Sequence, residues 1–434
     1  MPVSTSECAC TPEDPPSSVS SHRPRAASAP INANSGVRYG PLACLALGTF
    51  AVGTEGFMIA AILPGIATSL SVSVQMAGQL VTVFTLVFAV SSPILTALTG
   101  RVPRRKLLLM SMGVFALGNI AAASASGYWS LLLARAILAL AAGVYGPNAN
   151  ALAGVIVPED HRGRALAIVN GGFSVAVALG VPLGAFIGST WGWRVNFLGV
   201  AILALVAFVG VIAGIAKDAG TEQPPATLNE RLAVITQPAV VPALFVTTLW
   251  ALGGYAVYTY IAPFLATVAN LEGAPVGYVL FCWGAFAVVG LFIGGTINDK
   301  FGAGRAIAIA LPLMAVSLAS LSVSAAYARP SAALLPVLVA VAVWGVTAWG
   351  FFPPQQARLI GIAGLKNAPI ILSLNSSFQY LGFSLGAALG SVTLAVGGLD
   401  DLGWVGSACV LAAFLLFLAT DRRSRPPASG TNSR

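Results

Sequence analysis

Residues 163–194 read GRALAIVNGGFSVAVALGVPLGAFIGSTWGWR and carry the clearest structural signal in the chain. Small residues recur there at every fourth position: Gly172, Ala176, Gly180, Gly184 and Gly188. On a helix this spacing forms one face with almost no side chains, which lets another helix approach closely in lipid. Pro182 removes a backbone hydrogen bond within that face. The stretch therefore predicts a bent membrane-spanning helix with one face suited to close packing.

The composition of the whole chain is that of a membrane protein. Of its 434 residues, 57% are hydrophobic and 8% are charged, whereas soluble domains have about 25% charged residues. The apolar runs are about 20 residues long, as bilayer-spanning helices are, and lack the alternation of β-barrel strands. The net charge of +8 lies in short loops and tails, which argues against nucleic-acid binding. The five cysteines are scattered, and both histidines lie outside the spans. We therefore expect no metal and no cofactor.

Twelve membrane spans are expected in an all-α fold. They are predicted at residues 40–66, 76–99, 107–126, 128–155, 163–189, 193–216, 241–268, 275–297, 306–326, 331–356, 369–396 and 402–420. The Ser- and Pro-rich start of the chain predicts disorder, and the longest polar interruption separates two halves. The expected parts are a disordered tail (1–39), a six-helix bundle (40–216), a linker (217–240), a second six-helix bundle (241–420) and a second tail (421–434).

The positions of arginine and lysine predict the orientation. All of them except Arg135, Arg194 and Arg329 fall in the two tails, the linker or the loops that follow even-numbered spans. Because cytoplasmic loops carry an excess of these residues, both termini are expected in the cytoplasm. An even number of spans agrees with that result.

The two halves resemble each other in sequence. At a constant offset of 199, Ile62-Leu-Pro64 matches Ile261-Ala-Pro263 and Gly78 matches Gly277. Later matches keep the same order: Gly143-x3-Pro147-Asn148 with Gly350-x3-Pro354-Gln355, and Asn170-x2-Phe173 with Asn375-x2-Phe378. This order indicates a parallel repeat of two bundles, with a substrate site between them near the bilayer midplane.

Three motifs resemble those of the twelve-helix drug:proton antiporters of the major facilitator superfamily. The first, Gly180-Val-Pro182-Leu-Gly184, resembles the antiporter motif of the fifth helix. The second, Gly295-x3-Asp299-Lys300-x-Gly302-x2-Arg305, resembles a loop signature of the superfamily. The third, Gly53-Thr-Glu55-Gly-Phe57-Met58, resembles bacterial chloramphenicol, purine-nucleoside and arabinose-type exporters. The resemblance implies the major facilitator fold. We also expect Gly180, Pro182 and Gly184 to seal the fifth helix against a neighbour in the other half.

The resemblance also implies gating roles in two loops. In the second half these fall to Asp299, Lys300 and Arg305, whose charges would bridge helices in one state of the cycle. The equivalent first-half loop has the basic cluster Arg101, Arg104 and Arg105 but no aspartate. The alternative for both loops is simple anchoring of cytoplasmic positive charge.

Two ionisable side chains lie deep in predicted spans. Glu55 is the acidic residue there and Arg135 the basic one, and at mid-bilayer an ionised group costs at least about 2.5–3.5 kcal/mol. Arg135 matches the fourth-helix arginine of the superfamily, and that resemblance places it near Glu55. Burial and a nearby arginine act on a carboxylic acid in opposite directions, so Glu55 is the candidate proton carrier. The alternative is a static ion pair that fixes helix register.

Polar residues in the spans form the candidate substrate site. The set consists of amides and phenols on helices four, seven, ten and eleven: Asn148, Asn150, Tyr255, Tyr258, Gln355, Gln356, Asn375 and Gln379. Gln79, Phe57, Met58 and Trp344 are weaker candidates. Such amides and phenols can equally hold helices together.

These observations predict a proton-driven exporter of small organic molecules in a bacterial inner membrane, working as a monomer. No Walker A loop is present, which excludes an ATP-driven pump within this chain, and one Glu and one Arg are not enough for an enzyme. The alternatives are an exporter of a metabolite such as a nucleoside or sugar, and a membrane sensor or receptor that transports nothing.

Overall fold

A computed structural model describes residues 39–100, 102–158, 161–216, 219, 228–327 and 330–424. Within these ranges the chain is helical. The helices are α1 (Tyr39–Ser69), α2 (Val74–Leu98), α3 (Arg104–Ala123), α4 (Tyr128–Val155), α5 (Arg162–Val175), α6 (Val181–Trp191), α7 (Trp193–Gly214), α8 (Leu228–Ile235), α9 (Val240–Tyr258), α10 (Ile261–Ala269), α11 (Ala274–Phe301), α12 (Ala303–Tyr327), α13 (Pro330–Gly350), α14 (Phe352–Ala363), α15 (Ala368–Val396) and α16 (Leu402–Ser424).

Twelve helical segments of the described chain are long and apolar enough to cross a membrane, which confirms the predicted number. The predicted boundaries differ from the helices by up to a few residues in most spans and by more in two places. The seventh span, predicted as unbroken over 241–268, stops at Tyr258 and resumes as α10 at Ile261. The tenth span extends beyond 356, because α14 continues it to Ala363 after a turn at Phe351.

The fifth span contains a π-helical turn, Ala176–Gly180, between α5 and α6. In this turn Val181 donates its backbone N–H to the carbonyl of Ala176, five residues earlier. Pro182 follows directly and has no N–H to donate. The wider turn therefore joins two α-helical segments next to Pro182 and keeps the span continuous.

The glycine face of the fifth span packs against α1. A Cβ atom added at Gly180 would collide with the side chain of Thr54, and one at Gly184 would lie 2.8 Å from Met58 Cβ. The expectation that the motif seals the helix against the other half is therefore wrong for Gly180 and Gly184. Pro182 does contact that half, since its carbonyl oxygen lies 3.3 Å from the Cβ position of Gly277. The opposite half is reached by a different face of the same span, where Ala185 Cβ lies 3.2 Å from the Cβ position of Gly277 on α11.

The second half repeats this packing. Gly382, Gly386 and Gly390 on α15 face the backbone of α9, as the glycines of the fifth span face α1. In a membrane, close van der Waals contact between helices replaces much of the hydrophobic driving force that folds soluble proteins. Two equivalent glycine-lined contacts therefore stabilise the two halves in the same way.

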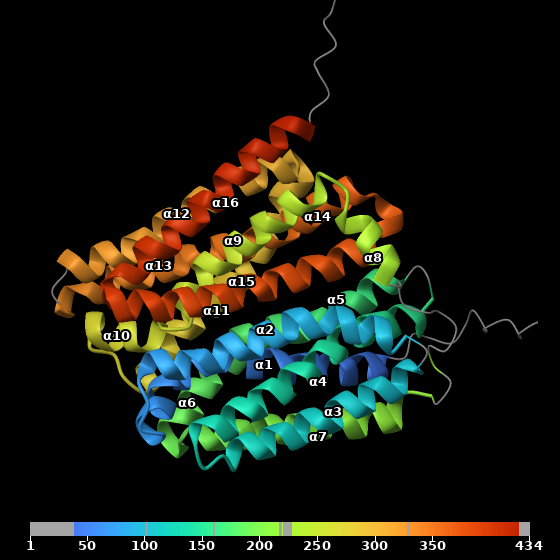
Figure 1. Ribbon diagram of the computed structural model, residues 1–434, viewed down its shortest axis with the longest axis horizontal. Coiled ribbons are helices and arrows are strands. Elements are labelled where there is room, and N and C mark those ends of the chain that lie inside the picture. The colour runs from blue at the N-terminus through green and yellow to red at the C-terminus, as the bar shows by residue number, and fades with distance from the viewer. Residues whose placement is uncertain are drawn as a thin grey trace, which may run out of the picture. The chain divides into compact units, whose positions relative to one another are not determined.

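The spans form two groups of six, seen in Figure 1 as the blue-to-green and the yellow-to-red helices. In the first group α1 packs on α5 and α7, and α3 packs on α4 and α7. In the second group α15 packs on α9, and α11 packs on α13. Between the groups, α2 contacts α15 and α6 contacts α11. The predicted two-bundle fold is therefore present.

Side-chain hydrogen bonds join the two groups near their interface. Ser384 Oγ donates to the carbonyl of Thr82 at 3.0 Å, and Gln79 Nε2 donates to Ser391 Oγ at 3.1 Å. Tyr258 Oη donates to the carbonyl of Phe57 at 3.2 Å. These bonds connect α1 and α2 with α9 and α15, and they position the site described below.

Candidate functional site

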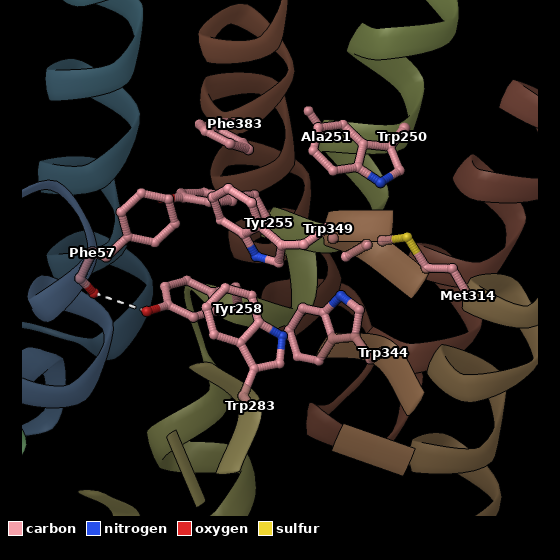
Figure 2. A pocket seen from close by; sticks show the side chains of 12 residues that line it. Phe57, Trp250, Ala251, Tyr255, Tyr258, Trp283, Met314, Trp344, Trp349 and Phe383 are labelled. Atoms are coloured by element: carbon pink, nitrogen blue, oxygen red, sulfur yellow. Dashed lines mark hydrogen bonds between the residues drawn. The ribbon is translucent and has the colours of Figure 1, made fainter. Parts of the chain in front are cut away.

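An aromatic pocket lies where α1 meets the second group of helices. It contains about 330 Å³ of space between atoms, part of it open to the surroundings. Four tryptophans, two tyrosines and two phenylalanines provide most of the lining, which consists of Phe57, Trp250, Ala251, Gly254, Tyr255, Tyr258, Trp283, Met314, Trp344, Ala348, Trp349 and Phe383. Figure 2 shows these side chains converging from several helices.

Phe57 is the member of this lining that comes from the first half of the chain. Its ring centroid lies 5.8 Å from that of Tyr255 and 5.6 Å from that of Tyr258, in both cases edge to face. It also lies 6.4 Å from the ring of Trp349. Phe57 therefore carries the contact between α1 and the pocket.

Helical spacing explains why these rings gather. Trp250, Gly254, Tyr255 and Tyr258 follow the i, i+4, i+5, i+8 pattern of one face of α9. On α13, Trp344 and Trp349 lie five residues apart and both line the pocket. Tyr255 and Tyr258, and the weaker candidates Phe57 and Trp344, were expected from the sequence and line the pocket. Four further lining residues were not expected: Trp250, Trp283, Trp349 and Phe383. Alignment of Trp250 with the two tyrosines on one helical face is a signal that was present in the sequence.

Glu55 and Arg135 form an ion pair between Glu55 Oε1 and Arg135 Nη1, and both side chains are fully buried. The predicted proximity of these residues is therefore confirmed. Arg135 also donates through Nε to the carbonyl of Leu80 at 3.3 Å, and its guanidinium lies 4.3 Å from the ring centre of Phe84. Glu55 Oε2 and Arg135 Nη2 have no hydrogen-bond partner among the described residues. The pair therefore retains a free acceptor and a free donor.

The ion pair is close to the aromatic pocket. Glu55 and Phe57 are two residues apart on α1, so their side chains leave the helix on nearly opposite sides. Tyr255 interacts electrostatically with both Glu55 and Arg135, and Tyr380 interacts with Glu55. Tyr255 also stacks on Phe383, with ring centroids 3.8 Å apart. A change in the pocket can therefore reach the ion pair through Tyr255 or through α1.

The amide side chains predicted to bind substrate lie outside the aromatic pocket. Gln355 Nε2 donates to Thr247 Oγ1 at 3.0 Å, and Thr247 Oγ1 donates to Asn375 Oδ1 at 2.7 Å, in a fully buried network. Asn150 exchanges two hydrogen bonds with Asn170, at 3.3 and 3.0 Å. Asn148 donates to the carbonyl of Val144 within its own helix.

Several of the other candidates also fall outside the pocket lining. These are Gln356 and Gln379, together with two of the weaker candidates, Gln79 and Met58. Within the described residues, no group of three or more His, Cys, Asp or Glu side chains gathers as metal ligands would.

The family model described as Major Facilitator Superfamily matches residues 45–387. The chain belongs to the major facilitator superfamily. The uncharacterized MFS-type transporter YbcL of Bacillus subtilis (strain 168) is 35% identical over 376 residues, which cover 86% of this chain and 94% of that protein. The chloramphenicol resistance protein of Streptomyces lividans is 32% identical over 386 residues, covering 87% and 95%. A crystal structure of peptide transporter POT shares the fold, with a TM-score of 0.73 at 14% identity and coverage of 88% and 94%.

Membership of the superfamily identifies the protein as a multi-pass membrane transporter and not an enzyme. The second-half loop, expected to act as a gate in this transporter, has an aspartate and a lysine that are exposed in this conformation. Asp299 is exposed, accepts a hydrogen bond from Asn298 Nδ2 at 3.2 Å, and forms no ion pair among the described residues. Lys300 is exposed as well.

The first-half loop holds two helices together. Arg105 Nη2 donates to the carbonyl of Ile212 at 3.0 Å and so connects the start of α3 with the end of α7. Arg104 begins α3, and Arg305 lies near the start of α12. Arg101 lies outside the described residues.

Proposed function

We propose that this transporter is a proton-coupled exporter of small organic molecules, an antiporter that works by alternating access. Glu55 carries the proton, Arg135 is its counter-ion, and the aromatic pocket holds the substrate. The observation that carries the proposal is the burial of the Glu55–Arg135 pair beside a pocket that reaches the same helix through Phe57. The distribution of arginine and lysine supports cytoplasmic positions for both termini. The bacterial relatives support a bacterial inner membrane location, and a monomer suffices to form the site.

The ion pair suits a proton carrier because its charges are isolated from water. Removing a proton from, or adding one to, Glu55 changes the net charge of a fully buried site, where electrostatic interactions are weakly screened. A protonated Glu55 binds Arg135 less strongly than an ionised one does. The protonation state of Glu55 therefore sets how firmly α1 is held to α4.

Substrate in the pocket acts on the same helix from its other side. A bound molecule presses on Phe57 and Tyr258, and Tyr258 holds the Phe57 carbonyl by a hydrogen bond. Movement of α1 then alters the contact between Glu55 and Arg135. The ligand shifts the equilibrium between two conformations in proportion to its difference in affinity for them.

The other motif residues have structural roles in this proposal. Pro182 and the π-helical turn let the fifth span bend, while Gly180 and Gly184 hold it against α1. The gating role in the other conformation of the transport cycle falls to the charged loop residues, which are Asp299, Lys300, Arg305 and the basic residues of the first-half loop. Gln355 and Asn375 hold α9, α14 and α15 together through Thr247.

Transport by the purified protein in liposomes made of lipid alone tests the proposal. With an imposed pH gradient, radiolabelled chloramphenicol should accumulate, and purine nucleosides serve as the metabolite alternative. Glu55→Gln keeps the size of the side chain but cannot titrate, so gradient-driven accumulation should disappear. If no candidate compound moves under any gradient, a membrane sensor or receptor becomes the better interpretation.

A further inference from the structure

The chemistry of the pocket lining restricts the molecule that it can bind. Within the lining, every side chain is aromatic, aliphatic or a thioether, and none carries a formal charge near neutral pH. Burying an isolated charge or an unpaired hydroxyl group there is costly, because the lining offers few polar partners. A sugar would leave several hydroxyl groups without hydrogen bonds. The lining therefore disfavours anions and polyhydroxylated compounds.

The rings of the pocket meet at angles that suit a flat aromatic guest. Trp283 is tilted by 41° to Tyr258, by 56° to Trp344 and by 70° to Trp349, with centroids 4.9–6.4 Å apart. Rings arranged in this way present faces on some sides of the cavity and edges on others. These rings touch one another in this conformation, so a flat guest must move them apart. It can then stack on one neighbour and contact another edge to face, the two arrangements that aromatic pairs prefer.

Two buried donors in the lining lack an acceptor. Trp250 and Trp283 are each 4% exposed, and their indole Nε1 atoms have no hydrogen-bond partner within the part of the chain that the structure describes. In Figure 2 both nitrogens lie on the sides of their rings that face the other lining residues. A buried donor without a partner costs about 1–3 kcal/mol, so an acceptor on a bound molecule would recover part of that cost.

We infer that the pocket selects a flat, uncharged aromatic group that carries a hydrogen-bond acceptor such as a carbonyl or nitro oxygen. The ring stacks among Tyr258, Trp283 and Trp349, and the acceptor takes the N–H of Trp250 or Trp283. This inference rests on the proposal that the pocket holds the transported molecule. It goes further by naming the chemistry that is recognised.

Three matched compounds separate the two requirements. 1-Acetylnaphthalene has the flat ring and the acceptor, 1-ethylnaphthalene has the ring alone, and 1-acetyldecalin has the acceptor on a saturated skeleton. Binding is measured by equilibrium dialysis of the purified protein in detergent, with empty micelles subtracted. Gly254→Leu is the blank, since a Cβ there already lies 3.1 Å from Met314 Cε and a leucine fills the cavity.

1-Acetylnaphthalene should bind tightest, and the other two should bind at least about fivefold more weakly. Trp250→Phe or Trp283→Phe keeps an aromatic ring but removes the N–H, so one of them should weaken 1-acetylnaphthalene to the level of 1-ethylnaphthalene. 1-Ethylnaphthalene should bind both variants as it binds the unmodified protein.

Equal binding of 1-acetyldecalin and 1-acetylnaphthalene overturns the inference, as does an unchanged preference for the ketone in both tryptophan variants. Binding in detergent involves no gradient, so this result is independent of the liposome assay. A carrier that transports chloramphenicol but fails the dialysis test retains its proposed function and loses only this assignment. A protein that passes the dialysis test but shows no gradient-driven transport in liposomes keeps the recognition chemistry and loses the proposed proton-coupled export.

Discussion

Tyr258 on α9 donates its hydroxyl hydrogen to the backbone carbonyl of Phe57 on α1, with 3.2 Å between the two oxygens. The bond joins the two halves of the protein two residues from Glu55 and at the edge of the aromatic pocket. Both tyrosine and carbonyl are buried, so water does not compete for the bond. This contact brings the aromatic pocket and the ion pair onto one helix.

Removing that hydrogen bond should loosen the contact between the halves. Tyr258→Phe keeps the ring but loses a bond with a net value of about 0.5–1.5 kcal/mol. We expect the population with α1 against α9 to fall, and disulfide cross-linking between Gln79→Cys and Ser391→Cys to decrease with it. Tyr278→Phe, at a side chain that is 75% exposed, is the matched control. Equal cross-linking in both variants would show that the bond does not hold the halves together.

The glycine face can be tested with two adjacent glycines. A Cβ at Gly172 would meet the backbone carbonyl of Ala46, which cannot move aside, whereas a Cβ at Gly171 meets nothing within 4 Å. Gly172→Ala should therefore destabilise the protein by about 1–3 kcal/mol through overpacking, and Gly171→Ala should not. Thermal unfolding in detergent, followed by tryptophan fluorescence, measures the difference. Similar unfolding temperatures for the two variants would contradict the packing of the fifth span on α1.

The ion pair can be separated into its structural and functional parts. Arg135→Ala leaves the Glu55 carboxylate buried without its counter-ion and should cost about 3–5 kcal/mol of stability. The double variant Glu55→Leu, Arg135→Met replaces both charges with apolar groups and should regain most of that loss. It should nevertheless transport nothing against a gradient. Normal gradient-driven transport by the double variant would reduce the pair to a packing element.

Asp299 should affect the transport rate and leave stability unchanged. Its side chain is exposed and forms no ion pair in the described part of the chain, so Asp299→Asn should change the free energy of unfolding by less than about 0.5 kcal/mol. We expect slower exchange in liposomes, because the proposed bridge forms in the opposite conformation. Asp400→Asn, another exposed aspartate, is the control. If Asp299→Asn transports at the normal rate, the loop serves only to set topology.

Much of the fold could be predicted from the sequence, because membrane spans depend on the length and hydrophobicity of single segments. The number of spans follows from such local signals. The closeness of Glu55 to Arg135 was implied by the resemblance of Arg135 to the fourth-helix arginine of the superfamily. The partner of the glycine face could not be predicted in the same way. Periodicity shows that Gly180 and Gly184 share a face, but the helix opposite them depends on how all the spans pack.

The candidate site was only partly predicted for a related reason. Tyr255 and Tyr258 stood out because their hydroxyl groups make them polar residues within spans. Most of the remaining lining is aromatic or aliphatic and looks like ordinary apolar sequence in a membrane span. Gln355 and Asn375 lie outside the pocket and both form hydrogen bonds with Thr247 Oγ1 in a buried network. The break between Tyr258 and Ile261 lies just before Pro263, which cannot donate a hydrogen bond to the carbonyl of Thr259 four residues earlier, so a local signal for it was present and was overlooked.

Proton release on substrate binding tests the role of Glu55 most directly. Chloramphenicol is added to the purified protein in weakly buffered detergent solution, and the pH is followed with an indicator dye. The unmodified protein and Glu272→Gln, which removes an exposed carboxylate, should release protons, whereas Glu55→Gln should release none. Unchanged proton release by Glu55→Gln, together with unchanged gradient-driven export, would contradict the assignment of Glu55 as the proton carrier.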